Sequence, residues 1–108
     1  MPLTARYSAD APSRADVDAL PGPTVLEFGT EWCGWCQGAQ AAIADAFEQH
    51  PEIRHLKVED GRGRPLGRSY GVKLWPTLVF LKDGHEVDRL VRPQAAGPIA
   101  DAMARIAG

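Results

Sequence analysis

Two cysteines, three positions apart, are the residues in this chain whose types and spacing are best suited to chemistry. Cys33 and Cys36 are the only cysteines among 108 residues. A Cys-x-x-Cys pair closes too small a loop to serve as a structural cross-link, so the spacing indicates either redox chemistry or half of a metal site. Structural metal sites usually need four ligands. The three histidines lack ligand spacing and are expected to be solvated surface residues: His50, His55 and His85.

The redox interpretation is therefore favoured, with no metal and no cofactor other than the Cys33–Cys36 disulfide itself. The pair is predicted to begin a helix directly after a strand. Unpaired N–H groups and the positive end of the helix dipole favour a thiolate at that position. Cys33 is expected at the outer tip and Cys36 one turn later, more buried. This order predicts that Cys33 attacks a disulfide and that Cys36 resolves the mixed disulfide.

The elements around this pair alternate between strands and helices. Apolar periodicity, turn residues and proline positions predict the following succession: a short strand 3–7, a helix 14–20, a strand 24–28, a helix from Cys33 to Pro51, a strand 53–58, a short helix 65–70, a strand 77–81, a hairpin turn at 82–84, a strand 86–91 and a last helix opened by Gly97 and Pro98. The order βαβαβαββα predicts an α/β fold with a central mixed sheet of four or five strands and helices on both faces. We expect one domain, residues 1–108.

Composition narrows the range of functions. Hydrophobic residues make up 44% and charged residues 24% of the chain, and the formal net charge is −2. These values are ordinary for a globular protein and give no basic surface for nucleic acid or anionic lipid. The apolar run 78–81 is far too short to cross a bilayer, and the first residues have no signal-like apolar core. We therefore expect a cytoplasmic monomer without nucleic-acid or membrane partners.

Three segments resemble the thioredoxin family. Residues 25–36, which end in Trp32-Cys33-Gly34-Trp35-Cys36, look like that family's second strand and active site. Residues 70–78 look like its cis-proline segment, and Lys82-Asp83-Gly84 looks like its final hairpin turn. The resemblance covers nearly the whole chain. The first two motifs together are specific, whereas Cys-x-x-Cys alone would not be.

This resemblance implies further site residues. Pro76 would follow a cis peptide bond and face Cys33, with the backbone of Trp75 placed to pair with an extended client peptide. Glu27 would be buried beneath Cys36 and take its proton during resolution, directly or through water, with a pKa raised by burial. The alternative for Glu27 is a solvent-facing position on a strand edge. The client-binding surface would comprise Trp32, Gly34, Trp35, Trp75, Thr77 and Arg92, although Trp32 and Trp75 could instead belong partly to the core.

The chain also departs from the family pattern. Trp35 replaces the proline that typical members have between the cysteines, and Ala41 occupies the place of a kinking proline. Trp75 stands where a smaller aliphatic residue is usual, and Arg92 stands where the family often has a glycine that lines the substrate groove. His55 occupies the place of a lysine that partners the buried carboxylate. These changes leave the chemistry credible and point to a particular set of clients.

The function implied by the resemblance is thiol–disulfide exchange, with reduction of protein disulfides as the leading hypothesis. Its partners would be client proteins with disulfides and an upstream disulfide reductase, such as a thioredoxin reductase. Two alternatives remain open. One is a thiol oxidase or isomerase, because potentials of Cys-x-x-Cys pairs span a wide range. The other is a redox-inactive binding adaptor on the same fold.

Overall fold

The computed structural model describes residues 6–107, and within them it contains a four-stranded mixed sheet with two layers of helices. The elements follow one another along the chain as α1 (Arg14–Asp18), β1 (Pro23–Gly29), α2 (Gly34–Gln49), β2 (Arg54–Glu59), α3 (Pro65–Ser69), β3 (Thr77–Lys82), β4 (His85–Val91) and α4 (Ala96–Ala107). The strand order in the sheet is β2-β1-β3-β4. Strands β1 and β2 are parallel, and the other two pairings are antiparallel. The predicted fold class is confirmed.

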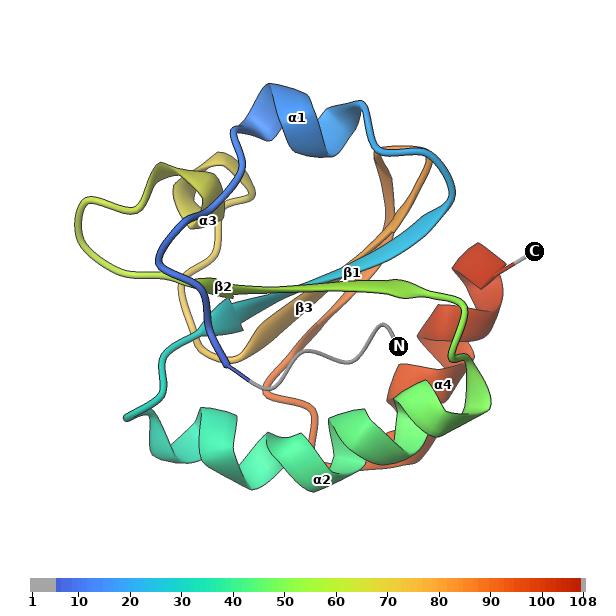
Figure 1. Ribbon diagram of the computed structural model, residues 1–108. Helices are drawn as coiled ribbons and strands as arrows, with labels where there is room; N and C mark the ends of the chain where they lie inside the picture. The colour runs from blue at the N-terminus through green and yellow to red at the C-terminus, as the bar shows by residue number, and fades with distance from the viewer. Residues whose placement is uncertain (1–5, 108) are drawn as a thin grey trace.

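Helices α2 and α4 cover one face of the sheet, and α1 and α3 cover the other (Figure 1). Strand β1 lies between β2 and β3, so both of its faces are buried and it carries side chains into both cores. Alternation along the strand sends Val25 into the core under α2 and α4, and sends Leu26 and Phe28 into the core under α1 and α3. Glu27 has the parity of Val25, which directs its carboxylate toward the α2 face.

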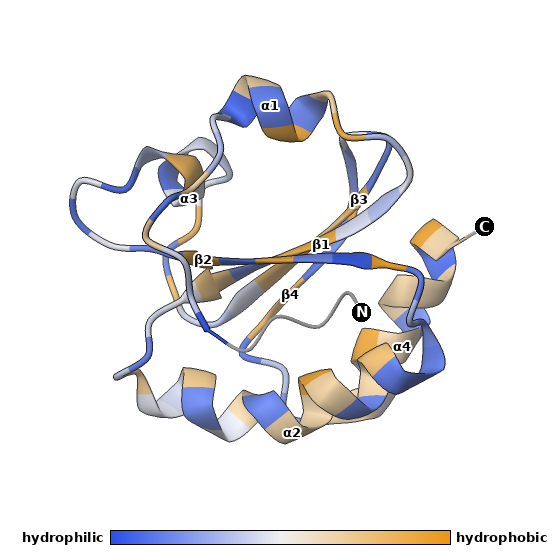
Figure 2. Ribbon diagram, viewed as in Figure 1, coloured by the Kyte–Doolittle hydropathy of each residue, from blue (hydrophilic) through white to orange (hydrophobic). Residues whose placement is uncertain are grey.

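Local sequence signals account for the ends of several elements. Ser13 caps α1 by accepting a hydrogen bond from the Asp16 N–H. The turn between β3 and β4 places Asp83 and Gly84 at positive φ, as the Asp-Gly pair predicts. In α4, Ile99, Ala102, Met103 and Ile106 are all buried, so its predicted apolar face is confirmed. The loop that joins β2 to α3 is drawn mostly in hydrophilic colours in Figure 2.

The structure matches the predicted bounds of the first two elements only in part. The predicted first strand 3–7 lies mostly outside the described residues, and within them Ser8 makes only an isolated parallel bridge to Val58. Helix α1 ends at Asp18 instead of Leu20, because the chain must turn toward β1, which begins at Pro23. No helix of residues 6–107 is both long enough and apolar enough to cross a bilayer.

Candidate active site

Both cysteines lie at the junction between β1 and α2, as predicted. Cys33 is the N-cap of α2, with extended backbone, and its Sγ accepts a hydrogen bond from the Cys36 N–H at 3.2 Å. Both side chains are free thiols. Cys33 is 8% exposed and Cys36 is 1% exposed, so Cys33 is the more accessible sulfur. The first turn of α2 therefore directs a backbone N–H donor at the Cys33 sulfur.

The Cys36 thiol is held in its protonated form. Burial raises its pKa to about 11, and the neighbouring Cys33 sulfur adds to this shift. The Thr30 backbone and the Tyr7 hydroxyl, which both favour the thiolate, lower the pKa of Cys36 but do not cancel this rise. At neutral pH Cys36 is therefore a thiol that must lose a proton before it can act as a nucleophile.

Glu27 lies fully buried on β1, on the face covered by α2. Its Oε2 accepts hydrogen bonds from the Tyr7 hydroxyl at 2.5 Å and from Gln40 Nε2 at 2.9 Å. Its Oε1 lies 2.9 Å from His55 Nε2. The alternative of a solvent-facing residue on a strand edge is therefore wrong. The carboxylate sits in a buried polar network in which both of its oxygens have partners.

The predicted rise in the pKa of Glu27 is wrong. Burial is the largest single influence and by itself would raise this pKa. The hydrogen bond and charge of His55, with hydrogen bonds from Tyr7 and Gln40, outweigh burial, so the pKa lies below its ordinary value of 4.5. The prediction assumed an apolar pocket, whereas the structure surrounds the carboxylate with donors that stabilise its charged form.

His55 is a second correction. It was expected to be solvated, but it is buried on β2, where it stacks on Phe47 with ring centroids 4.7 Å apart and meets Glu27. The resemblance had already placed it where the family has a lysine partner for the carboxylate, and the structure gives it that contact. His50 is partly buried and pairs with Glu52, whereas His85 is exposed at the start of β4.

Three members of this network were not predicted as site residues. Gln40 lies one turn after Cys36 on α2, where its Nε2 also donates to the Cys36 carbonyl at 2.8 Å. Lys57 Nζ donates to Gln40 Oε1 at 2.8 Å and lies 4.5 Å from the centre of the Tyr7 ring. The i, i+4 spacing of Gln40 from Cys36 was a usable signal, and so was the alternation of Lys57 with His55 on one strand. Tyr7 carried no local signal, because it comes from a segment far away in sequence.

The predicted cis peptide bond between Trp75 and Pro76 is confirmed. Trp75 packs against the cluster of Tyr7, Cys33 and Cys36, and its indole N–H donates to Asp60 Oδ2 at 2.9 Å. The Trp75 carbonyl, however, is already occupied: it accepts a hydrogen bond from Arg92 Nε at 2.9 Å. An extended peptide that pairs here must therefore share this carbonyl with Arg92 or displace the guanidinium.

Arg92 has the positive φ that is typical of glycine, and it carries a long, positively charged side chain. Its φ is +53°, and its N–H donates to the Pro76 carbonyl at 2.8 Å. Its guanidinium carbon lies 4.7 Å from the centre of the Trp35 ring, a cation–π distance. The position thus keeps the left-handed backbone that favours glycine, while its side chain spans from Trp75 to Trp35 across the surface beside the cysteines.

The tryptophans form an exposed surface around the cysteines. Trp32 is 75% exposed and Trp35 is 49% exposed, which settles the open alternative for Trp32 in favour of the surface. Trp32 meets Trp75 edge-on, with ring centroids 5.8 Å apart, and Trp75 is half-buried. Thr77, by contrast, is buried, and its hydroxyl donates to the Leu74 carbonyl at 2.6 Å, so its side chain holds the local turn.

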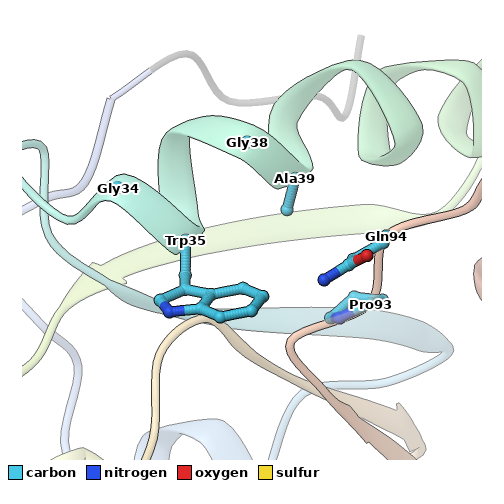
Figure 3. Close-up of a pocket in the computed structure, with 6 residues that line it drawn as sticks. All are labelled: Gly34, Trp35, Gly38, Ala39, Pro93 and Gln94. Carbon is cyan, nitrogen blue, oxygen red and sulfur yellow. The ribbon is translucent and has the colours of Figure 1, made fainter.

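An open hollow of about 540 Å³ lies beside this surface. Gly34, Trp35, Gly38 and Ala39 of helix α2 line one side, and Pro93 and Gln94, which follow β4, line the other (Figure 3). Nothing lies within 4 Å of the point where a Cβ on Gly34 or Gly38 would stand. A peptide backbone would therefore have room beside the start of α2 on this side.

The chain is similar to a known protein family in its sequence and to solved structures in its fold. The family model described as Thioredoxin matches residues 8–105. The structure of thioredoxin 2 from Pseudomonas aeruginosa PAO1 in its reduced form is 57% identical, with a TM-score of 0.87 and 98% of each chain covered. Thioredoxin from Fasciola hepatica is 26% identical, with a TM-score of 0.68 and with 85% of this chain and 86% of that chain covered.

Similarity extends to curated sequences. Thioredoxin H-type 1 from Nicotiana tabacum is 37% identical over 67 residues, which are 62% of this chain and 53% of the tobacco protein. The matched part of the chain thus spans about half the length of that relative.

Proposed function

Because the chain belongs to the thioredoxin family, we propose that it is a thiol–disulfide oxidoreductase that reduces disulfides in client proteins. The observation that carries this proposal is the unequal placement of the two thiols. Cys33 is the N-cap of α2 and the less buried of the two, and Cys36 is a fully buried thiol beside the Glu27 network. A binding adaptor would not need two thiols within one helical turn, the second of them beside a buried carboxylate that can accept its proton.

The reaction follows from this placement. The Cys33 thiolate attacks one sulfur of the client disulfide, and the other client sulfur leaves as a thiolate that takes a proton from water. Cys36 then loses its proton and attacks Cys33 Sγ, which forms the Cys33–Cys36 disulfide and breaks the bond to the client. Two electrons pass from the pair to the client, and both come from the two thiols.

The recycling step requires a partner that returns two electrons to the Cys33–Cys36 disulfide. We assign this role to an upstream disulfide reductase, such as a thioredoxin reductase. A compartment in which thiols are kept reduced, such as the cytoplasm, suits the direction of electron flow proposed here.

The surface beside Cys33 supports a preference among clients. Trp32, Trp35 and Trp75 offer apolar contact, and Arg92 adds one positive charge over Trp35. A client with acidic residues next to its disulfide would engage the guanidinium and release the Trp75 carbonyl for pairing with the client backbone. We therefore propose that acidic flanking residues favour a client, an effect that salt weakens.

The test of the proposed reaction is catalysis of insulin reduction by dithiothreitol, followed by turbidity. Turnover that depends on Cys33 supports the reductase, and inertness of the folded protein would support the adaptor instead. A redox titration of the Cys33–Cys36 pair against glutathione separates the remaining alternative. A potential near that of reducing family members supports a reductase, whereas a much more oxidising potential would indicate an oxidase or isomerase.

A further inference from the structure

The Tyr7 hydroxyl lies between the resolving thiol and the buried carboxylate. It donates to Glu27 Oε2 at 2.5 Å, and Cys36, in the same packed cluster, is its second polar neighbour. The Cys36 sulfur and the Tyr7 hydroxyl oxygen both lie beside the backbone of Gly29. A Cβ added to Gly29 would stand 2.6 Å from Cys36 Sγ and 2.7 Å from the Tyr7 hydroxyl oxygen. The absence of a side chain at Gly29 therefore leaves room for the contact between sulfur and hydroxyl.

The direction of these hydrogen bonds follows from the number of hydrogens. A tyrosine hydroxyl carries one hydrogen and can accept through its oxygen. Since this hydrogen is donated to Glu27, the oxygen is left to accept from the S–H group of Cys36. In this arrangement the Cys36 S–H group donates to the Tyr7 oxygen, and the Tyr7 O–H group donates to the Glu27 carboxylate.

Several contacts hold Tyr7 in this position. Its backbone N–H donates to Glu31 Oε2 at 2.5 Å, and the next residue, Ser8, bridges to Val58. Lys57 lies over the face of its ring, and the side chain is only 8% exposed. The hydroxyl is thus fixed from three sides, as a group that passes a proton must be.

The ionisation behaviour of Tyr7 agrees with a relay and disfavours an independent base. Burial, followed by the charge of Glu27, raises the pKa of Tyr7 well above its ordinary value of 10.0. The hydroxyl therefore does not give up its proton by itself at neutral pH. It can pass a proton to Glu27 only as it receives one from Cys36.

We propose that the Tyr7 hydroxyl is a catalytic proton relay between Cys36 and Glu27 in the resolution step. When Cys33 is bonded to a client, the Cys36 S–H hydrogen moves to the Tyr7 oxygen and the Tyr7 hydrogen moves to Glu27 Oε2. The Cys36 thiolate then attacks Cys33 Sγ and the client sulfur leaves. The proton on Glu27 then passes through water to the departing client thiolate. This inference rests on the proposed function, because it concerns its second step.

The test separates the two steps of one turnover. Wild type and Tyr7→Phe are mixed with oxidised glutathione, quenched with acid and analysed by intact-mass spectrometry for reduced, glutathione-bound and disulfide forms. We expect formation of the glutathione-bound form to be unchanged and its resolution to slow by about tenfold. That is less than the 10²–10⁴-fold range of general acid–base catalysis, because Glu27 remains. Glutathione serves as the probe, so failure of the protein-reductase proposal would not affect this readout.

Matched variants distinguish a relay from a packing role. Tyr70→Phe removes the hydroxyl of the other buried tyrosine, which packs in the core under α1 and α3, and should resolve at the wild-type rate. Tyr7→Phe combined with Glu27→Gln should be no slower than Glu27→Gln alone, since both variants interrupt one route. Multiplied effects of the two substitutions would contradict the relay, and so would a folded Tyr7→Phe that resolves like wild type.

A measurement on the wild type covers the case in which Tyr7→Phe does not fold. The resolution rate is measured in mixtures of H₂O and D₂O. Two protons that move together predict a curved dependence of the rate on the deuterium fraction. A linear dependence, or none, would overturn the proposal.

Discussion

The two sulfurs of this site face opposite kinds of surroundings. Around Cys36, the buried side chains of Tyr7, Glu27 and His55 and the partly buried side chain of Gln40 form a polar network on the α2 side of the core. Around Cys33, large aromatic side chains lie at or near the surface, and Trp32 is the most exposed of them. The interior region is suited to moving a proton, and the exterior region is suited to choosing a client.

The energetic consequences of the two regions differ for the same reason. A buried polar network in low dielectric is strong when all its members are paired and costly when one partner is removed. An exposed aromatic or cationic side chain loses little when it is truncated, because water replaces its contacts. Substitutions in the interior should therefore change both stability and the second chemical step, whereas substitutions outside should change only client selection.

The largest effects are expected at the cysteines themselves. Cys33→Ser should lower insulin reduction by at least about 10³-fold, since no other nucleophile is available at the helix tip. Cys36→Ser should leave attack intact and accumulate a mixed disulfide with the client, visible by mass spectrometry. Faster alkylation of Cys36 than of Cys33 at neutral pH would contradict the division of roles.

Substitution at Glu27 should produce the next-largest effect. Glu27→Gln keeps the shape of the side chain but removes the proton acceptor, so resolution should slow by about 10²-fold while attack by Cys33 is unchanged. The variant should also lose about 1–3 kcal/mol of the free energy of unfolding, because His55 and Tyr7 are left with poorer partners. Wild-type rates of resolution at all pH values would remove Glu27 from the mechanism.

The acid dependence of stability gives a separate readout of Glu27. Its pKa is lower in the folded chain than its ordinary value of 4.5, so the charged form stabilises the fold. This contribution is fully present above about pH 4.5 and is lost as the pH falls through the lowered folded value. Urea unfolding at several pH values should show this loss in wild type, and Glu27→Gln should show a smaller dependence between pH 5 and the acid limit.

A smaller effect is expected at Arg92. Arg92→Gly suits the positive φ at this position and frees the Trp75 carbonyl. It should reduce the preference for peptide disulfides with acidic over basic flanks by about two- to fivefold at low salt, the range of an exposed ion pair. Arg92→Gln is the matched control, which removes the charge but retains a donor. Equal rates of wild type with acidic and basic peptides would refute the role.

The smallest effect is expected at Trp32. Trp32→Ala should change the free energy of unfolding by less than about 0.5 kcal/mol, because the side chain is exposed. The KM for a protein client should rise by about twofold with kcat unchanged, since a partly exposed aromatic contact contributes on the order of 0.5 kcal/mol. Val87→Ala, an exposed apolar residue on β4, is the control. A loss of stability for Trp32→Ala comparable to that of Glu27→Gln would erase the contrast between the two regions.

Local physics allowed much of this protein to be predicted from its sequence. The Asp83-Gly84 turn, the apolar face of α4 and the position of Cys33 at a helix start depend on backbone conformation and periodicity within a few residues. The spacing of Cys33 and Cys36 left redox chemistry and half of a metal site open, and the lack of further ligand spacing in the sequence favoured redox chemistry. The cis bond before Pro76 was predicted by resemblance and not by local physics.

Tertiary structure decided what surrounds each sulfur. The donors that lower the pKa of Glu27 come from α2, from β2 and from the segment before α1. The sequence of β1 itself gives no indication of them. The burial of His55 depends on which face of β2 packs under α2. The hydrogen bond from Arg92 to Trp75 depends on two segments that meet only in the folded sheet. These contacts join residues far apart in sequence, so their geometry exists only once strand register and helix packing are in place.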